Sequence, residues 1–265
     1  MNKQIIFSDL DGTFLDHKNY SYKNSIPAIK KIKEKKIPLI FCSSRVRTEI
    51  EPFYKKLKIK APFISENGGA IFIPKKFFNF KFKFEYSEKN YDVIVFGKKY
   101  IELRKAFTEI KKETGFTIKG FGDFTIKGLS KNAGISLAKA KLAKQREFTE
   151  PFIIKKGNLE KIKKKILKKG FKYTKGGRYH YIMGNNNKGK AVKTLLKLFK
   201  KQFGKINSTS VGDGLNDLPM LLTTTKGYQV KNYKGEYNFY NPKIIRVNSI
   251  GPEGFTQVIE QILKK

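Results

Sequence analysis

Two short groups of aspartates, each placed directly after a predicted strand, constrain this chain more than any other feature. Asp9 and Asp11 follow the short apolar run Ile-Ile-Phe, and Asp213 and Asp217 follow Ser-Thr-Ser-Val. Each run is typical of a buried strand that carries its acids at the carboxyl end. If the two strands are neighbours in one parallel sheet, the four carboxylates meet at the edge where open α/β sheets build their sites.

The acids stand out because the rest of the chain is strongly basic. The 265 residues include 57 Lys+Arg and 22 Asp+Glu, which gives a net charge of +35. Only six of the basic residues are arginine, and the lysines are spread along the chain. This distribution favours solvated lysines over a nucleic-acid surface, which usually clusters its charge and relies on arginine. The positive field would still attract anionic small molecules such as phosphate esters.

The composition predicts a globular protein. Hydrophobic residues make up 39% of the chain, with 23 Phe and 13 Tyr, which suits a packed core and argues against disorder. The single cysteine, Cys42, excludes an intramolecular disulfide framework and a cysteine-based zinc site. No segment approaches the roughly 18 apolar residues of a membrane span, and the first residues lack the apolar core of a signal peptide. We therefore expect a soluble cytoplasmic protein, monomeric or homodimeric, without a membrane partner.

The pattern of apolar and polar residues changes twice along the sequence. Residues 1–82 and 186–265 alternate strand and helix patterns, which predicts a doubly wound, mostly parallel α/β sheet. Residues 83–185 mix strands and helices differently and predict an inserted α+β domain. The aromatic–lysine alternation at residues 77–84 favours a strand and hinge over a platform that stacks nucleic-acid bases.

The hydrophobic periodicity places the individual elements. Predicted strands lie at residues 5–7, 38–41, 62–64, 70–73, 92–96, 152–154, 171–173, 208–211 and 244–247. Predicted helices lie at residues 25–36, 48–57, 100–114, 136–147, 159–169, 191–199, 217–222 and 255–263. Residues 66–69 read as a turn and residues 120–128 as a loop.

Several carboxylates at one strand edge repel one another, and a hard divalent cation with oxygen ligands is the usual remedy. Mg²⁺ is the best fit, because it keeps some waters and completes its octahedron with substrate phosphate. Lys188 and Ser43 would supply a positive charge and a hydroxyl donor to that phosphate. An aspartate can then attack the phosphorus and form an aspartyl phosphate. A second aspartate two residues on can protonate the leaving oxygen and later deprotonate water.

Three motifs carry a resemblance to a known family. They are Asp-Leu-Asp-Gly-Thr from residue 9, Gly-Asp-Gly-Leu-Asn-Asp from residue 212, and Lys188-Gly between them. Together they resemble the motifs of the haloacid dehalogenase superfamily of phosphohydrolases. The resemblance implies that Asp9 is the nucleophile and Asp11 the acid/base, with Ser43 and Lys188 as further catalytic residues. It also implies that the insertion is a type-2 cap.

The same resemblance implies a Mg²⁺ site in which Asp9 and Asp213 hold the ion and an outer acid orients water or lysine. The candidate metal ligands are Asp9, Asp11, Asp213 and Asp217.

Four longer segments resemble the mannosyl-3-phosphoglycerate phosphatases. They are Pro-Phe-Ile-Ser-Glu-Asn-Gly-Gly-Ala-Ile-Phe-Ile-Pro (62–74), Arg-Glu-Phe-Thr-Glu-Pro-Phe (146–152), Gly-Gly-Arg-Tyr-His (176–180) and Lys-Gly-Lys-Ala-Val (188–192). After the second strand that family usually has Thr-Ser-Lys-Thr, where this chain has Ser-Ser-Arg-Val. An arginine pair in the cap suits a glycerate carboxylate, and Glu or Thr suits sugar hydroxyls. The candidate substrate-binding residues are Thr13, Ser44, Glu66, Asn67, Arg146, Glu147, Thr149, Arg178, His180 and Asn216.

Some of these residues also have a purely structural interpretation. Ser43 would suit the cap of the following helix, and Glu66 and Asn67 would suit a turn. A lone histidine such as His180 is most often structural. Cys42 is expected to be a small buried filler.

The resemblance implies a phosphomonoesterase that converts mannosyl-3-phosphoglycerate to mannosylglycerate and phosphate. The nearest alternatives are a phosphatase of the same superfamily for other sugar phosphates and one for glucosyl-3-phosphoglycerate. A phosphotransferase such as a mutase would need an alcohol acceptor that outcompetes water. A distant alternative is a lysine-rich nucleic-acid-binding protein with a degraded catalytic site. The core catalytic motifs are all filled, which argues against this alternative.

Overall fold

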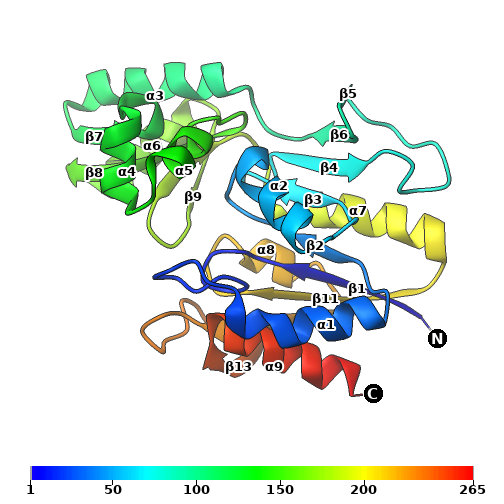
Figure 1. Ribbon diagram of the computed structural model, residues 1–265. Helices are drawn as coiled ribbons and strands as arrows, with labels where there is room; N and C mark the ends of the chain where they lie inside the picture. Colours follow the sequence, from blue (N-terminus) through cyan, green and yellow to red (C-terminus); the bar gives the residue numbers. More distant parts are fainter. Residues whose placement is uncertain (1, 265) are drawn as a thin grey trace.

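The computed structural model describes residues 2–264. Figure 1 shows two bodies side by side, a larger one that contains both ends of the described chain and a smaller one formed by its middle. The strands form three sheets, one of five strands and two of four.

The larger body is built on the parallel five-stranded sheet, with strand order β13-β12-β11-β1-β2. The pairing of β1 with β11 is parallel, so the two strands that precede the acid groups are neighbours, as predicted. The five strands are β1 (Lys3–Ser8), β2 (Leu39–Phe41), β11 (Ile206–Gly212), β12 (Lys226–Lys231) and β13 (Ile245–Ile250).

Helices cover both faces of this sheet, which confirms the doubly wound α/β prediction. Ile6 of β1 packs into one hydrophobic cluster, whereas Ile5 and Phe7 pack into the other, as a strand buried on both faces requires. The helices on the Ile6 face are α1 (Ile26–Glu34), α2 (Arg47–Lys56) and α9 (Gly251–Leu263). Those on the other face are α7 (Lys188–Phe203) and α8 (Leu218–Leu221).

An antiparallel sheet, with order β3-β4-β6-β5, continues the larger body beyond β2. It adjoins β2 through a parallel bridge between Cys42 and Ile64, and its Val93 packs into the same cluster as Ile6. The boundary predicted at residue 83 therefore lies before a strand pair of this sheet and not at a change of sheet. The strands are β3 (Phe63–Ser65), β4 (Ala70–Pro74), β5 (Tyr86–Glu88) and β6 (Tyr91–Val95).

The smaller body, which we call the cap, extends from α3 to β10 and contains the second antiparallel sheet, β7-β8-β10-β9. Its strands are β7 (Thr117–Gly120), β8 (Thr149–Lys156), β9 (Lys172–Lys175) and β10 (His180–Met183). Its helices are α3 (Tyr100–Thr114), α4 (Ile126–Ala133), α5 (Leu137–Ala143) and α6 (Leu159–Lys168). The boundary predicted at residue 186 falls in the connection between β10 and α7.

Some elements differ from the prediction. Residues 77–85 form no strand, and the predicted strand there is wrong, because Phe77 and Phe78 pack edge-on against Phe199 of α7. The predicted loop at residues 120–128 contains a 3₁₀ turn, η2 (Phe121–Asp123), and the start of α4. Strands β5, β7, β10 and β12 and the turn η1 (Lys23–Ser25) were not predicted.

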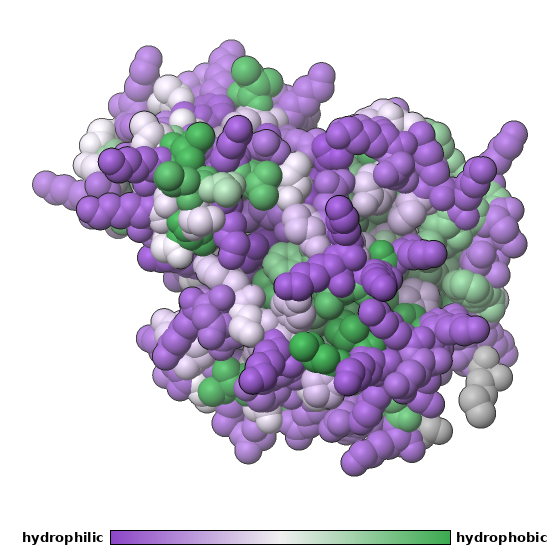
Figure 2. All heavy atoms as spheres, viewed as in Figure 1, coloured by the Kyte–Doolittle hydropathy of each residue, from purple (hydrophilic) through white to green (hydrophobic). Residues whose placement is uncertain are grey.

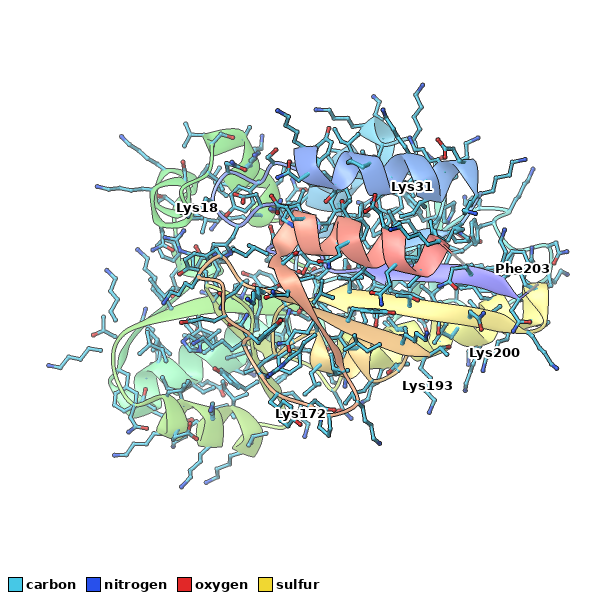
Figure 3. The ribbon with its side chains drawn as sticks, turned by 90° about the horizontal axis from the view of Figure 1, so that it is seen from below. Lys18, Lys31, Lys172, Lys193, Lys200 and Phe203 are labelled. Carbon is cyan, nitrogen blue, oxygen red and sulfur yellow. The ribbon has the colours of Figure 1, made fainter. Side chains whose placement is uncertain are left out.

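Hydrophilic residues dominate the visible surface of both bodies (Figure 2). Figure 3 shows lysines that extend outward from well-separated elements, among them Lys18, Lys31, Lys172 and Lys193. The positive charge is thus spread over the molecule and is not gathered into one patch. Across residues 2–264, no helix combines the length and apolarity needed to cross a membrane.

The Tyr54 hydroxyl joins the parallel sheet to the antiparallel one. It donates to Pro62 O at 2.7 Å and accepts from Phe41 N at 3.1 Å, and the side chain is buried. Tyr54→Phe leaves both backbone groups without this partner, and we expect it to lower the free energy of unfolding by about 1–3 kcal/mol. Thermal and denaturant unfolding measure the loss. Tyr240→Phe, at a ring that is 74% exposed, is the control, and an equal effect in both variants would contradict the assignment.

Candidate active site

Three of the four motif aspartates converge at the carboxyl edge of the parallel sheet. Asp9 directly follows β1, and Asp213 directly follows β11, so the pairing of these strands brings the two side chains together. Asp217 precedes α8 and completes the group, in which one oxygen of each carboxylate lies within 4.8 Å of the others. All three side chains are buried. The predicted convergence of the two acid groups therefore holds for Asp9, Asp213 and Asp217.

Lys188, the first residue of α7, lies in the middle of this group. Its side chain is 0% exposed, and its Nζ donates to Asp9 Oδ1 and to Asp217 Oδ1, both at 2.5 Å. The second oxygen of Asp217 accepts the amides of Asp213 at 3.1 Å and Gly214 at 2.9 Å. Burial disfavours the ammonium, but Asp217 and Asp9 outweigh it and raise the pKa of Lys188. Asp217 thus holds both the lysine and the backbone of the acid loop.

The carboxylates retain more negative charge than one lysine neutralises. Burial, followed by the charge of Asp217, raises the pKa of Asp9, and Lys188 only partly offsets these effects. The same two causes raise the pKa of Asp213 to about 7, although Thr13 Oγ1 donates to its Oδ1 at 3.1 Å. Three closely spaced carboxylates that carry more negative charge than Lys188 neutralises are a donor set that suits a hard divalent cation such as Mg²⁺.

The Asp11 side chain does not join this group, so the structure does not bring its carboxylate together with the other predicted metal ligands. Both of its oxygens are bound by the Arg45 guanidinium, Oδ2 by Nε at 2.8 Å and Oδ1 by Nη2 at 2.6 Å. Burial acts to raise the pKa of Asp11, but Arg45 outweighs it and the pKa is lowered. The physical reason is the bidentate pair, which turns the carboxylate toward α2.

Ser43 and Ser44 lie on the loop between β2 and α2, beside the turn that joins β3 and β4. Ser43 accepts from Asn67 N through its carbonyl at 2.9 Å and from Arg45 N through Oγ at 3.1 Å. Because an accepted hydrogen bond leaves the hydroxyl hydrogen to donate elsewhere, Ser43 retains the capacity predicted for it.

The turn after β3 brings three asparagines together. Asn67 has a left-handed φ of 56°, and its Oδ1 accepts from Asn216 Nδ2 at 3.0 Å. Its carbonyl accepts from Asn186 Nδ2 at 3.3 Å. Asn67 Nδ2 is buried and finds no hydrogen-bond partner within residues 2–264. Asn67 and Asn216 are therefore brought together as candidate residues, and Asn186 is a partner that the sequence did not indicate.

The Glu66 carboxylate binds the cap, which differs from the predicted contact with substrate. Its Oε1 accepts Glu147 N at 2.9 Å, and its Oε2 accepts Phe148 N at 3.2 Å and Thr149 N at 2.9 Å. Thr149 Oγ1 and Arg146 Nε also lie within reach of Oε2, at 2.8 and 3.2 Å. With these donors around it, the fully buried carboxylate ties the start of β8 to the core.

The cap sheet presents one face to the core and the other to its own helices. Tyr181 of β10 lies beside Ser44 and Arg146, and Arg146 Nη2 donates to Ser44 O at 3.0 Å. His180 points to the opposite face, where it packs against Phe152 and its Nδ1 lies 2.7 Å from the Tyr173 hydroxyl. Because neighbouring residues of a strand face opposite sides, the structure does not bring His180 together with the candidates on the Tyr181 face.

The two remaining cap candidates are Arg178 and Glu147. Arg178 Nη1 donates to Ala133 O at 3.0 Å, within the cap. Burial, together with the charges of Glu66 and Glu88, raises the pKa of Glu147 to about 7, although Arg47 opposes the shift.

Arg45 and Tyr181 are further candidates that motif reasoning missed. Arg45 carried a signal in the composition, because it is one of only six arginines among 57 basic residues. Tyr181 had no comparable signal, since its direction depends on the register of β10 with β8.

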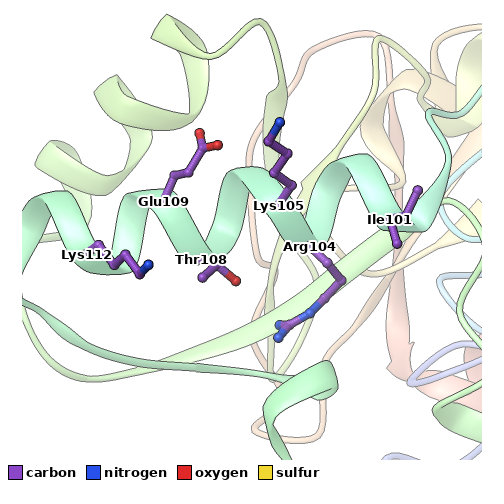
Figure 4. A pocket seen from close by; sticks show the side chains of 6 residues that line it. All are labelled: Ile101, Arg104, Lys105, Thr108, Glu109 and Lys112. Carbon is purple, nitrogen blue, oxygen red and sulfur yellow. The ribbon is translucent and has the colours of Figure 1, made fainter.

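A shallow hollow on the outer surface of α3 lies away from these residues. Figure 4 shows that its lining comes from that one helix. Its lining residues are Ile101, Arg104, Lys105, Thr108, Glu109 and Lys112. It has no part in the acid group at the strand edge.

Comparison with known proteins decides the family. The sequence profile of the haloacid dehalogenase-like hydrolases matches residues 6–254. The chain belongs to this family. It is 44% identical to the glucosyl-3-phosphoglycerate/mannosyl-3-phosphoglycerate phosphatase of Methanococcoides burtonii, over 99% of this chain and 98% of that protein. It is 39% identical to the mannosyl-3-phosphoglycerate phosphatase of Pyrococcus furiosus, over 82% of this chain and 86% of that protein.

The fold of this hydrolase also has a close structural counterpart. A crystal structure of a Thermoplasma acidophilum protein superposes with a TM-score of 0.70 at 17% identity, covering 100% of this chain and 99% of that one. At this identity the likeness concerns the fold alone.

Glu147 makes the stability of the protein depend on pH. Its pKa is about 7 in the folded protein against the ordinary 4.5, so the folded state binds more protons than the unfolded chain between these values. Stability contributed by the protonated group is therefore lost as the pH rises through this window. We expect Glu147→Gln to unfold at the same temperature as the wild type near pH 4.5 and at a higher temperature at pH 8.

Thermal unfolding between pH 4.5 and 8 measures this difference. The exposed Glu34 serves as the control position, with Glu34→Gln. A gain for Glu147→Gln that does not change with pH would show that the charge is not its source.

Proposed function

We propose that this hydrolase is a Mg²⁺-dependent phosphomonoesterase that removes phosphate from mannosyl-3-phosphoglycerate or glucosyl-3-phosphoglycerate. The observation that carries the proposal is the buried group of Asp9, Asp213, Asp217 and Lys188 at the carboxyl edge of the sheet. The names of relatives that match over 82–99% of the chain support the substrate.

In the first step the Asp9 carboxylate attacks the phosphorus. A bond forms between an Asp9 oxygen and phosphorus, and the bond between phosphorus and the ester oxygen breaks. Asp11, in its protonated form, gives its proton to the departing alcohol oxygen. Lys188 and the hydroxyl of Ser43 bind phosphoryl oxygens and stabilise the charge that develops on them.

In the second step the aspartyl phosphate on Asp9 is hydrolysed. Asp11 takes a proton from water, whose oxygen attacks the phosphorus, and the bond to Asp9 breaks to release phosphate. Mg²⁺, held by Asp9 and Asp213, would neutralise phosphoryl charge and screen the carboxylates from the phosphate. Asp217 keeps Lys188 and the acid loop in place through its bonds to both. Thr13 orients Asp213 in the same way.

The organic part of the substrate would lie between the core and the cap. Arg146 and Tyr181 approach Ser44 from the cap side, next to the loop that would bind the phosphate. Asn67 Nδ2 is a buried donor beside the same loop and is suited to a substrate oxygen. Closure of the cap over these groups would exclude bulk water from the reacting atoms.

Removal of the nucleophile tests the chemistry. We expect Asp9→Asn to lower turnover by at least about 1,000-fold, because the amide is a poor nucleophile and the covalent step is lost. EDTA should abolish the wild-type activity and added Mg²⁺ should restore it. Phosphate release measures both effects, and circular dichroism verifies the fold. Retained turnover in Asp9→Asn would remove Asp9 as the nucleophile.

A substrate panel tests the specificity. It contains mannosyl- and glucosyl-3-phosphoglycerate, hexose phosphates and an aryl phosphate, each assayed for kcat/KM with Mg²⁺. We expect values for the two glycosyl-phosphoglycerates that exceed the others by about 100-fold or more, which corresponds to about 2.7 kcal/mol of transition-state binding. Equal values across the panel would keep the chemistry and reject the narrow substrate.

A further inference from the structure

We propose that Arg45 exchanges partners during catalysis: it holds Asp11 until a substrate with a carboxylate near its phosphate ester takes over the guanidinium. Arg45 would thereby make the reaction specific for esters that carry a second anionic group. This inference rests on the proposed function, in which Asp11 is the acid/base.

The pair engages both oxygens of Asp11. Arg45 Nε and Nη2 bind the two Asp11 oxygens at 2.8 and 2.6 Å, in the parallel two-bond geometry that a guanidinium and a carboxylate prefer. A carboxylate held in this way has both oxygens directed at the guanidinium, which leaves only their outer lone pairs for another partner. Release from Arg45 would free Asp11 to approach an ester oxygen or water.

Arg45 lies where a second substrate anion would reach it. Arg45 comes two residues after Ser43, whose hydroxyl would bind the phosphate, and Arg45 N donates to Ser43 Oγ at 3.1 Å. A carboxylate a few bonds from the phosphate would therefore lie near the guanidinium. The Arg45 and Asp11 side chains are 14% and 32% exposed, so the pair is partly open to solvent. Arg146 of the cap donates to the carbonyl oxygen of Ser44, which is the residue before Arg45. The Arg45–Asp11 pair therefore lies on the part of the core that the cap contacts.

The surroundings allow Arg45 to change partner without leaving the site. Its guanidinium lies over the Tyr20 ring at 5.1 Å and near the Phe53 ring at 5.8 Å. Glu49 Oε1 lies 3.7 Å from Arg45 Nη1, so the guanidinium keeps one charge partner when Asp11 is released. A lysine at this position would bind Asp11 as a point charge, whereas the planar arginine fork matches either carboxylate equally.

A matched pair of small esters isolates the carboxylate. 3-Phosphoglycerate and glycerol 3-phosphate differ only in a carboxylate against a hydroxymethyl group. In the wild type we expect kcat/KM to favour 3-phosphoglycerate by about 10- to 100-fold, the range for one charge-assisted bidentate contact. In Arg45→Gln the preference should fall to within about threefold, and kcat for glycerol 3-phosphate should rise because Asp11 is no longer held.

Two further variants make the comparison sharper. Arg45→Lys keeps the charge without the fork and should show an intermediate preference. Arg47→Gln removes a neighbouring arginine that pairs with Glu51 and Glu88, and it should retain the wild-type preference. Thermal unfolding of each variant verifies that the fold is intact.

The outcomes separate this inference from the function on which it rests. An equal loss of kcat for both esters in folded Arg45→Gln would show that Arg45 only positions Asp11, and no preference in the wild type would also overturn the exchange. If neither small ester is hydrolysed, and the glycosyl-phosphoglycerates are not hydrolysed either, the proposed function fails. Calorimetric titration of the two esters into Asp9→Asn, with and without Arg45→Gln, then still tests the partner exchange of Arg45. Tighter binding of 3-phosphoglycerate that depends on Arg45 supports the exchange, and equal binding of the two esters rejects it.

Discussion

The buried ammonium of Lys188 is the interaction on which the rest of the site depends. It lies between Asp9, after β1, and Asp217, before α8, and donates to both. Without it, the three carboxylates would face one another in a buried place with no internal cation, a strongly unfavourable arrangement. The contact forms only when β1 pairs with β11 and α7 begins at Lys188. The topology of the larger body therefore sets the charge balance of the site.

The attachment of the cap is the second constraint. The chain passes between the bodies at residues 96–99 and 184–187, and the Glu66 carboxylate adds a third connection through the amides at the start of β8. Arg146 Nη2 donates to Ser44 O beside these bonds, so several contacts to the core hold the start of β8.

The sequence predicted most of the larger body because each of its central strands is a short apolar run bounded by helices. Strand β12 was not predicted because its polar Gln229 and flanking lysines interrupt the apolar pattern of a buried strand. Residues 77–85 were wrongly predicted as a strand because their aromatic–lysine alternation has the period of a strand, although the aromatic rings pack on α7. For the site, the motifs indicated Asp9, Lys188 and their neighbours. They could not indicate where the carboxylates of Asp11 and Glu66 point, since a remote arginine and the cap backbone decide this.

The contrast between lysine and arginine connects composition with mechanism. Lys188 is the one buried lysine within residues 2–264, and the others remain at or near the surface, where they raise the field that attracts anions. Such a field is long-ranged and does not distinguish one phosphate ester from another. Selection needs a fixed donor geometry, which the guanidinium supplies and the flexible ammonium does not. Four of the six arginines form ion pairs with carboxylates, namely Arg45, Arg47, Arg104 and Arg146. Two of these four, Arg45 and Arg146, lie between the core and the cap, where the proposed substrate would carry its carboxylate.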